Sequence, residues 1–291
     1  MKIIISIPAY NEEKTLPPVI AELKKVMKST QYKSQYKILV LNDGSTDKTA
    51  LIAKTAGAIV VSNKKNIGLA ETFKREMEEC LKLDADVIVH TDADGQYPAK
   101  YIPKLIEKVI LGHDLVIGSR FSGGNYSGSI SKKVGNIAFA KTFSKLLNTK
   151  ITDTTTGFRA FGKNVAKLPL INSFTYTQEQ LIRVGKKGLS ICEIPITTRK
   201  TRASRLFKNP FDYAIKAWIN ILRIYRDFEP LKFFGKIGLL IMVPGFLIGI
   251  YLLMNLIITG HAGYINFSIL SILFIIVGLQ IVLFGFLADM R

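Results

Sequence analysis

The chain has 291 residues, of which 48% are hydrophobic, and its 40 Lys and Arg against 22 Asp and Glu give a formal net charge of +18. The length allows one large domain with an appendage, and two distant cysteines, Cys80 and Cys192, exclude a disulfide-stapled scaffold and favour a reducing compartment. The charge alone fits a nucleic-acid binder. Basic residues become more frequent toward the apolar C-terminal part, so we expect anionic lipid head groups as the partner and no nucleic acid; a nucleic-acid binder is the disfavoured alternative.

The first 120 residues alternate segments typical of strands and of helices. Strands are expected at residues 2–7, 37–41, 58–61, 86–91 and 114–117, and helices at 12–27, 46–56, 69–83 and 101–111. This βαβα order predicts an α/β fold with a mainly parallel sheet and helices on both faces.

A polar turn closes the first expected strand. Asn11 is a candidate N-cap of the next helix, and Glu12 favours the positive helix end. Helix capping does not explain Pro8 and Tyr10 at a strand tip, where the flat ring of Tyr10 could line a nucleoside pocket.

A second polar turn, residues 42–47, closes the second strand. Capping by Ser45 or Thr46 explains part of it. The functional alternative places Asp43 at the same sheet edge as Tyr10, able to accept a hydrogen bond from a base or a ribose.

Two carboxylates, Asp92 and Asp94, follow the strand at 86–91, with Gln96 close behind. Ligands of open α/β sheets collect at the carboxyl ends of strands, and carboxylate and amide oxygens suit Mg²⁺ or Mn²⁺. An ordinary turn is the alternative, because Asp, Gly and Gln are common there. The pattern predicts a metal–diphosphate site.

Three weaker signals lie nearby. The amides of residues 66–70, which open the third helix, could face a diphosphate. Arg120 ends the fifth strand as a candidate phosphate clamp, although surface arginines are common. Residues 121–131 are rich in Gly and Ser, and Lys132 and Lys133 then begin an amphipathic helix that runs to about Leu147. These two lysines either form a solvated helix end or attract a lipid phosphate.

The C-terminal part has no Asp, Glu, Lys or Arg between Lys236 and Asp289. Segments 237–258 and 264–288 each exceed the ~20 apolar residues that cross a bilayer, and a polar turn separates them. Buried soluble helices are disfavoured, since such helices rarely lack charge on every face. The basic residues before this hairpin place its ends on the cytoplasmic side. Residues 209–225 resemble an interfacial helix.

The motifs together resemble glycosyltransferase family 2. They are Pro8-Ala9-Tyr10-Asn11-Glu12, Asn42-Asp43-Gly44-Ser45-Thr46-Asp47, Asn66-Ile67-Gly68-Leu69-Ala70, Asp92-Ala93-Asp94-Gly95-Gln96 and Gly118-Ser119-Arg120. Asp153-Thr154-Thr155-Thr156-Gly157-Phe158-Arg159-Ala160 is similar to a segment of the branch that makes polyprenyl-phosphate sugars, such as dolichol-phosphate mannose synthases and polyprenyl-phosphate glucosyltransferases.

The resemblance covers residues 1–208 and implies a GT-A-like catalytic domain there. The charge and hydropathy pattern adds a juxtamembrane part at 209–232 and a transmembrane hairpin at 233–291. The family's Arg-x-x-Gly-x-Ser-Lys segment is matched by Arg199 and Ser204, while Arg202 replaces the glycine and Arg205 the lysine. The implied roles are nucleoside binding by Pro8, Tyr10, Glu12 and Asp43, donor contacts by Asp92, Ala93, Asp94, Arg199 and Arg205, metal binding by Asp92, Asp94 and Gln96, and acceptor-phosphate binding by Arg120 with Lys132 and Lys133.

The expected activity is therefore inverting transfer of a hexose from a nucleotide-diphosphate sugar, of the GDP-mannose or UDP-glucose type, to a membrane polyprenyl or dolichyl phosphate, with Mg²⁺ or Mn²⁺. A polysaccharide or glycolipid synthase of the same fold and a catalytically silent, membrane-anchored binder of nucleotide sugar are the alternatives. Sugar, nucleotide, polyprenol and any homo-oligomer stay open.

Overall fold

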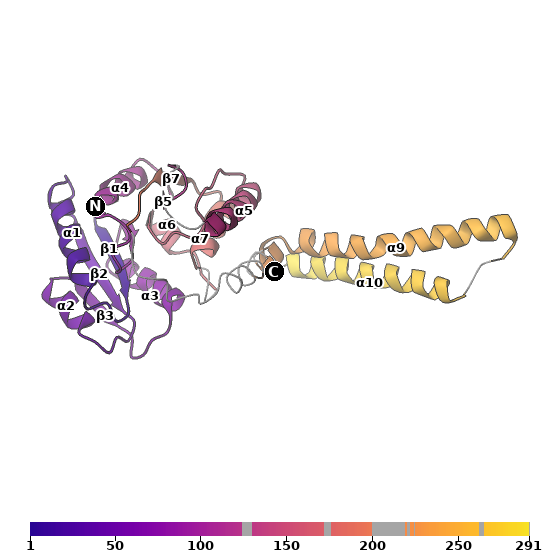
Figure 1. Cartoon of the computed structure of the whole chain (residues 1–291), viewed down its shortest axis with the longest axis horizontal. Coiled ribbons are helices and arrows are strands. Elements are labelled where there is room, and N and C mark those ends of the chain that lie inside the picture. Colours follow the sequence, from indigo (N-terminus) through magenta and orange to yellow (C-terminus); the bar gives the residue numbers. More distant parts are fainter. Residues whose placement is uncertain are drawn as a thin grey trace. The chain divides into compact units, whose positions relative to one another are not determined.

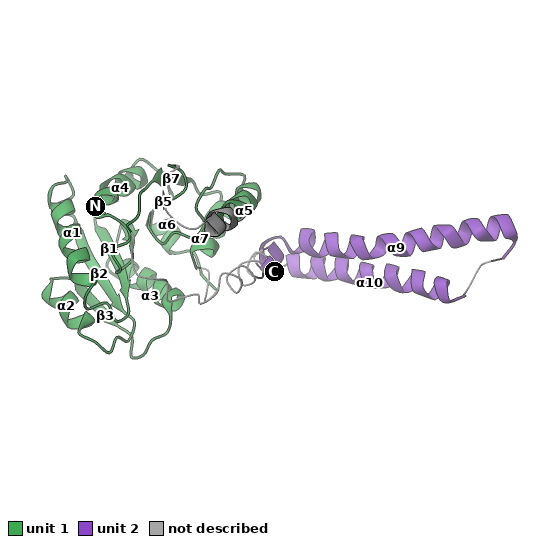
Figure 2. Ribbon diagram, viewed as in Figure 1, with its two compact units in different colours: residues 1–204 green, residues 205–291 purple. Residues whose placement is uncertain are grey.

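The computed structural model describes residues 1–123, 130–171, 176–199, 219, 222–223, 225–261 and 265–290, with the backbone alone for 130–135 and 138. The chain divides into two compact units, Met1–Ser204 and Arg205–Arg291 (Figure 2). The predicted boundary at residue 208 lies outside the described residues, as does most of the expected interfacial helix. The three-part division therefore stays a prediction.

The first unit alternates strands and helices along the chain (Figure 1). Its elements are β1 (Ile3–Ala9), α1 (Leu16–Lys28), β2 (Tyr36–Asn42), α2 (Thr49–Thr55), β3 (Ile59–Ser62), α3 (Leu69–Lys82), β4 (Val87–His90), η1 (Ala99–Tyr101), α4 (Ile102–Ile110), β5 (Leu115–Ser119), α5 (Ile130–Leu147), β6 (Arg159–Gly162), α6 (Lys163–Ala166), α7 (Tyr176–Lys186) and β7 (Ile191–Pro195).

These strands form one seven-stranded sheet in the order β3-β2-β1-β4-β6-β5-β7. Strand β6 runs antiparallel to β4 and β5, and the other pairs are parallel. The predicted mainly parallel α/β sheet is confirmed. Its carboxyl edge gathers the residues that follow β1, β2, β4 and β5, together with the segment that precedes the reversed strand β6.

Two apolar layers cover the sheet. On one face Ile3, Ile5 and Ile7 of β1 pack with the buried positions of α1 and α4. Successive strand residues point to opposite faces, so Ile4 and Ser6 lie on the other face, where Ser6 bonds to α3. Helices therefore lie on both faces, as the sequence pattern indicates.

The helix that follows β1 begins later than the capping pattern predicts. Helix α1 starts at Leu16 with Thr15 as N-cap, and Asn11 has a φ of 54°. The Asn11 side-chain oxygen accepts a hydrogen bond from the Thr46 amide at 2.9 Å, and the Asn11 amide donates to the Ser45 hydroxyl at 2.9 Å. The capping roles expected of Asn11, Ser45 and Thr46 are wrong, because these groups join two loops instead.

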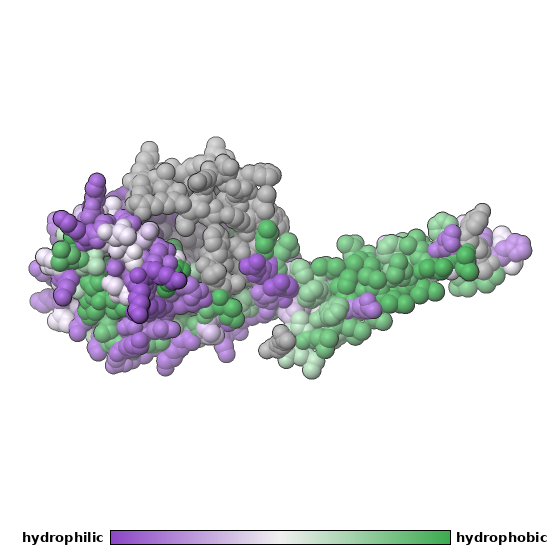
Figure 3. Space-filling model, turned by 90° about the horizontal axis from the view of Figure 1, so that it is seen from below, coloured by the Kyte–Doolittle hydropathy of each residue, from purple (hydrophilic) through white to green (hydrophobic). Residues whose placement is uncertain are grey.

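The second unit contains two long helices, α9 (Pro230–Thr259) and α10 (Ile265–Asp289). Both are long and apolar enough to cross a membrane, and only 17% of each apolar window is buried. Figure 3 shows a nearly continuous hydrophobic surface over the visible side of these helices. A soluble core helix would bury such side chains, so the exposure argues against the buried-helix alternative.

Small residues line the contact between α9 and α10. Gly238, Gly245, Ser271, Gly278 and Gly285 are the buried positions besides Pro230. A Cβ atom on Gly278 would lie 2.7 Å from the Gly238 carbonyl oxygen and would collide with Met242. The Ser271 hydroxyl donates to the Gly245 carbonyl at 2.7 Å. The seam thus lets the two backbones approach closely, as in packed membrane helices.

Candidate active site

Asp43 is the centre of a hydrogen-bonded loop at the ends of β2 and β3. It is 4% exposed, and its carboxylate accepts from the Asn63 side-chain amide at 2.7 Å and from the backbone amides of Ile67 and Gly68 at 2.9 and 3.0 Å. A Cβ atom on Gly44 would lie 2.6 Å from the Asn66 nitrogen, so the two loops need glycine for their close approach. Asp43 thus fixes the start of α3 beside the sheet edge.

The other residues expected at the nucleoside lie around this loop. Pro8 is buried within β1, whereas Tyr10 is 39% exposed. Glu12 is 7% exposed, its amide donates to the Thr49 hydroxyl at 2.8 Å, and its carboxylate accepts from the Thr15 hydroxyl. The fold brings Tyr10, Glu12 and Asp43 to one edge, and their roles toward a nucleoside stay predictions.

The acidic pair lies immediately after β4. Asp92, Asp94 and Gln96 are all half-buried, and Asp94 accepts from the Gln96 amide at 2.9 Å. Ala93 between them is buried. Two carboxylates and an amide, all with exposed surface, fit a hard divalent cation that keeps water and phosphate ligands. The described residues contain no group of three or more His, Cys, Asp or Glu side chains arranged to hold a metal ion, so they would supply only part of its coordination.

The pKa of Asp92 is raised to about 6, chiefly because burial disfavours the charged carboxylate. The electrostatic interaction with His90 lowers this pKa, and the charge of Asp94 raises it further. The side chain nevertheless keeps 31% of its surface exposed, so a cation could reach it. A cation there would offset the burial penalty.

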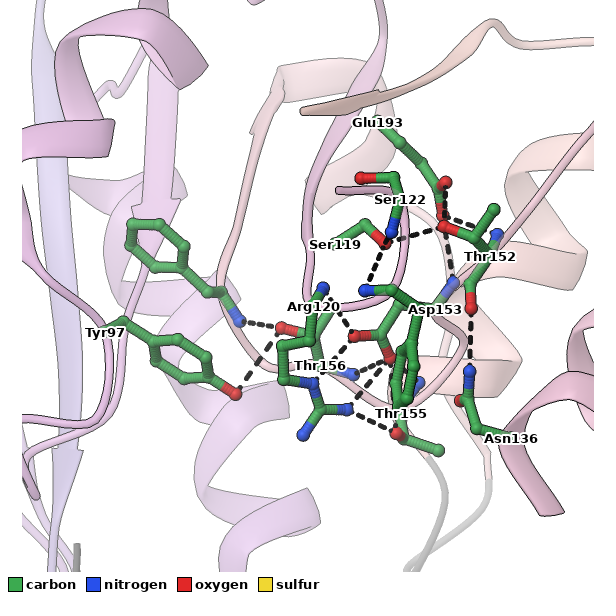
Figure 4. A network of polar contacts seen from close by, with 12 residues as sticks. Tyr97, Ser119, Arg120, Ser122, Asn136, Thr152, Asp153, Thr155, Thr156 and Glu193 are labelled. Atoms are coloured by element: carbon green, nitrogen blue, oxygen red, sulfur yellow. Dashed lines mark hydrogen bonds and ion pairs between the residues drawn. The ribbon is translucent and has the colours of Figure 1, made fainter. Parts of the chain in front are cut away.

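Arg120 follows β5 and is held in place by the segment before β6 (Figure 4). Its Nε and Nη2 atoms donate to the two oxygens of Asp153 at 2.7 and 2.9 Å, and Nη2 also donates to the Thr155 hydroxyl at 2.7 Å. Burial raises the pKa of Asp153, but the hydrogen bonds and charge of Arg120 outweigh this and leave it below the ordinary value. Bidentate pairing fixes the orientation of the guanidinium.

A second tier of hydrogen bonds supports this pair (Figure 4). Glu193 of β7 accepts from the Asp153 amide at 3.1 Å and from the Thr152 hydroxyl at 2.6 Å. The Thr152 hydroxyl lies 2.6 Å from the Ser119 hydroxyl, and Asn136 of α5 donates to the Thr152 carbonyl at 2.7 Å. Strands β5 and β7 and helix α5 therefore support the Arg120–Asp153 pair.

The remaining predicted residues divide into described and undescribed ones. The Arg199 amide donates to the Gln96 carbonyl at 2.9 Å, but its guanidinium bonds to Glu22 at 2.7 and 2.9 Å. Lys132 and Lys133 lie in α5, with side chains outside the described part. Arg205 falls wholly outside the described residues. The roles of these four residues stay predictions.

Sequence reasoning missed a polar cluster directly under Asp92. His90 and Glu76 are fully buried, and His90 Nδ1 lies 2.7 Å from a Glu76 oxygen. Their signal was a histidine at the end of an apolar strand and a glutamate on the inner face of α3. Asn63, which holds Asp43, was also missed, although it follows β3 as the other site residues follow their strands.

Known proteins resemble the chain in sequence and in fold. A model named glycosyl transferase family 2 matches residues 4–168. A dolichyl-phosphate hexose transferase of Haloferax volcanii is 33% identical over 209 residues, which cover 69% of this chain and 84% of that protein. A dolichol-phosphate mannosyltransferase of Pyrococcus furiosus is 30% identical over 94% of this chain and 78% of its own length.

Among solved structures, glucosyl-3-phosphoglycerate synthase of Mycobacterium tuberculosis, in complex with Mn²⁺, UDP and glucosyl-3-phosphoglycerate, superposes with a TM-score of 0.60. The match covers 77% of this chain and 78% of that one at 21% identity. At this identity the likeness shows the shared fold alone.

Proposed function

Because the chain belongs to glycosyl transferase family 2, we propose that it transfers a hexose from a nucleotide-diphosphate sugar to the phosphate of a membrane polyprenol. The names of the two relatives given above identify dolichyl phosphate as their acceptor. The sequence resemblance to the branch that makes polyprenyl-phosphate sugars supports the same acceptor class. The products would be a polyprenyl-phosphate sugar and a nucleoside diphosphate, with inversion at the anomeric carbon.

The donor half of the site would be formed by the residues after β1, β2 and β4. Tyr10 and the loop held by Asp43 would bind the nucleoside, and Asp92, Asp94 and Gln96 would hold Mg²⁺ or Mn²⁺ beside the diphosphate. The cation would offset negative charge on the diphosphate. The Arg199 amide bonds to the Gln96 carbonyl, so the positively charged guanidinium of Arg199 belongs to a residue beside this loop and could also bind the diphosphate.

The acceptor half would be formed by Arg120 and its supports. A phosphate monoester has a second pKa near 6, so a lipid phosphate is largely dianionic at neutral pH and needs no strong general base. One phosphate oxygen would attack the anomeric carbon while the bond to the diphosphate oxygen breaks. Arg120, oriented by Asp153, would align the phosphate for that attack.

The hairpin would hold the catalytic unit at the membrane, where the acceptor is dissolved. Helices α9 and α10 have the length and apolar surface for this. Lys232 and Lys236 near the start of α9 belong to the basic residues that favour a cytoplasmic orientation. A soluble donor would then meet a lipid acceptor at the inner surface of the membrane.

The observation that carries the proposal is the acidic pair and the Asp153-bound Arg120 at one sheet edge. The test is to incubate membranes containing the chain with labelled GDP-mannose, UDP-glucose or UDP-N-acetylhexosamines and to extract the organic-soluble product. Asp92→Asn and Asp94→Asn should abolish product. Asp84→Asn, at the opposite edge, is the matched control because its carboxylate pairs with Lys163 on the surface.

Each other outcome has a definite meaning. Binding of a nucleotide sugar without lipid-linked product would indicate the silent binder. Product that grows into a polymer would indicate a polysaccharide synthase. Undiminished product in both acidic variants would refute the role of the acidic pair.

A further inference from the structure

A row of polar side chains crosses three neighbouring strands beneath the acidic pair. Ser6 of β1 lies opposite His90 of β4, and His90 lies opposite Arg159 of β6. All three are fully buried. Buried polar groups are costly unless they are hydrogen-bonded, so such a row inside an apolar sheet calls for a specific set of partners.

Two helices supply those partners. Glu76 of α3 accepts from the Ser6 hydroxyl and lies 2.7 Å from His90 Nδ1. Tyr176 of α7 places its hydroxyl 3.3 Å from His90 Nε2, and Arg159 donates to the Thr177 carbonyl at 3.1 Å. Hydrogen bonds thus fix both nitrogens of the His90 ring.

Aromatic packing removes the remaining freedom of the ring. Phe73 of α3 contacts His90 edge-on at a centroid distance of 4.9 Å, and the Tyr176 ring does so at 5.9 Å. Two helices on one face of the sheet therefore hold His90 in one orientation.

The row ends against Asp92. His90 Nε2 lies 4.0 Å from Asp92 Oδ1, and Asp92 accepts no hydrogen bond within the described part of the chain. A Cβ atom on Gly157 would lie 3.2 Å from that oxygen and 3.3 Å from the Tyr176 hydroxyl. Asp92, His90 and Tyr176 therefore converge on a backbone position that carries no side chain.

We propose that His90, held by Glu76 and Tyr176, is a positioning residue that fixes the Asp92 carboxylate for a divalent cation. The inference rests on the proposed function, which assigns the cation to Asp92. Groups behind a metal ligand typically change metal affinity 10- to 100-fold, because a site must be held to within ~0.5 Å. His90 Nε2 lies 4.0 Å from Asp92 Oδ1, and the groups that support His90 come from β1, α3 and α7.

The test measures Mn²⁺ binding directly. Full-length protein in detergent is titrated with Mn²⁺, alone and with UDP or GDP, and free Mn²⁺ is followed by electron paramagnetic resonance. His90→Gln should raise the Mn²⁺ dissociation constant about 10- to 100-fold. In turnover the same variant should raise the KM for Mn²⁺ more than it lowers kcat, a split that a general loss of folded protein would not produce.

Two variants keep the test decisive. Tyr176→Phe removes one hydroxyl and keeps the packing, so it should fold and still weaken Mn²⁺ binding several-fold. His113→Gln makes the same substitution before β5, at the other edge of the sheet, and should bind Mn²⁺ like the wild type.

The outcomes separate this inference from the proposed function. Wild-type Mn²⁺ affinity in Tyr176→Phe and in folded His90→Gln would overturn the positioning role alone. A wild-type chain that takes up no Mn²⁺, with or without nucleotide, would overturn the metal part of the proposed function and this inference with it.

Discussion

The guanidinium of Arg199 grips the carboxylate of Glu22 with both of its terminal nitrogens, at 2.7 and 2.9 Å. Glu22 belongs to α1 and also accepts from the Ala99 amide at 3.1 Å, just beyond the acidic pair. Arg199 is 51% exposed and Glu22 29%, and exposed pairs contribute only about 0–1 kcal/mol. Separating the two side chains therefore costs little, as the donor-diphosphate contact proposed for Arg199 would require.

This pair gives the first prediction. Arg199→Gln should raise the KM for the sugar donor about tenfold, because the proposed diphosphate contact, worth about 1.4 kcal/mol, would be lost. Glu22→Gln should lower that KM, because it releases the guanidinium. Both variants should melt within a few degrees of the wild type. Lys163→Gln, which breaks a similar exposed pair at the far edge, should leave the KM unchanged. A wild-type KM in Arg199→Gln would restrict Arg199 to a structural role.

The loop at Asp43 gives the second prediction. Asp43→Asn replaces a carboxylate that accepts from three donors, and hydrogen bonds to charged groups are worth about 1.5–3 kcal/mol. Residues 63–68 should loosen, so trypsin should cut after the exposed Lys64 or Lys65 at least about tenfold faster. Mass spectrometry of the early fragments measures the rate. Asp84→Asn is the control, and equal rates in all three proteins would contradict the prediction.

The third prediction concerns Asp153 and Arg120. The pKa of Asp153 is depressed, so its stabilising effect is present above the ordinary carboxyl pKa and is lost as the pH falls through the depressed value. Asp153→Asn should lower the free energy of unfolding by about 3 kcal/mol at pH 7, because it removes the carboxylate that pairs with a largely buried guanidinium. Urea unfolding measured between pH 7 and pH 3 should show that the difference in free energy of unfolding between the variant and the wild type becomes smaller as the pH falls. A constant difference would argue against the ion pair as its source.

The raised pKa of Asp92 gives the fourth prediction. A carboxyl with a raised pKa contributes stability that is full below its ordinary value and is lost as the pH rises through about 6. In a chelator at pH 7.5, Asp92→Asn should therefore melt at a higher temperature than the wild type, and the difference should disappear toward pH 4. Adding Mn²⁺ should stabilise the wild type and not the variant. A lower melting temperature for Asp92→Asn at pH 7.5 would count against the burial penalty.

The helix seam gives the fifth. Gly278→Leu should separate α9 from α10, because even a Cβ atom there collides with Met242. The protein in detergent should melt earlier and lose its monodisperse elution in gel filtration. Gly235→Leu is the matched control, since nothing lies within 4 Å of a Cβ atom at that position. An equal drop in melting temperature for both variants would show that leucine destabilises the two helices at any position and would contradict the prediction.

The sequence predicted the buried strands and most helices because apolar spacing reports packing directly. Strand β6 escaped prediction because it has only four residues and contains Arg159, a charged side chain that is nevertheless fully buried. Its Nη1 atom donates to the Thr177 carbonyl and to the Gln180 side-chain oxygen, whereas its Nε atom has no hydrogen-bond partner among the described residues. The residues next to Arg159 in the sequence do not indicate these hydrogen-bond partners, because both lie about twenty residues further along the chain, on helix α7.

The candidate site was predictable where a polar residue follows a parallel strand, as Asp43 and Asp92 do. Asp153 precedes its strand, so only the family resemblance pointed to its segment, and its bond to Arg120 depends on the reversal of β6. Asn11 shows the opposite case, where a local capping signal lost to a contact with Thr46.

The place of β5 in the sheet has a consequence for the order of assembly. Both of its neighbours, β6 and β7, come later in the chain, whereas β1 to β4 pair among themselves. During synthesis the part of the sheet that bears Asp43 and Asp92 can form first. Strand β5 stays unpaired until β6 has been made and has taken its place between β5 and β4. A nascent chain that stalls before residue 159 would therefore expose an unpaired apolar strand, Leu115–Ser119, which is prone to aggregate and which chaperones would bind.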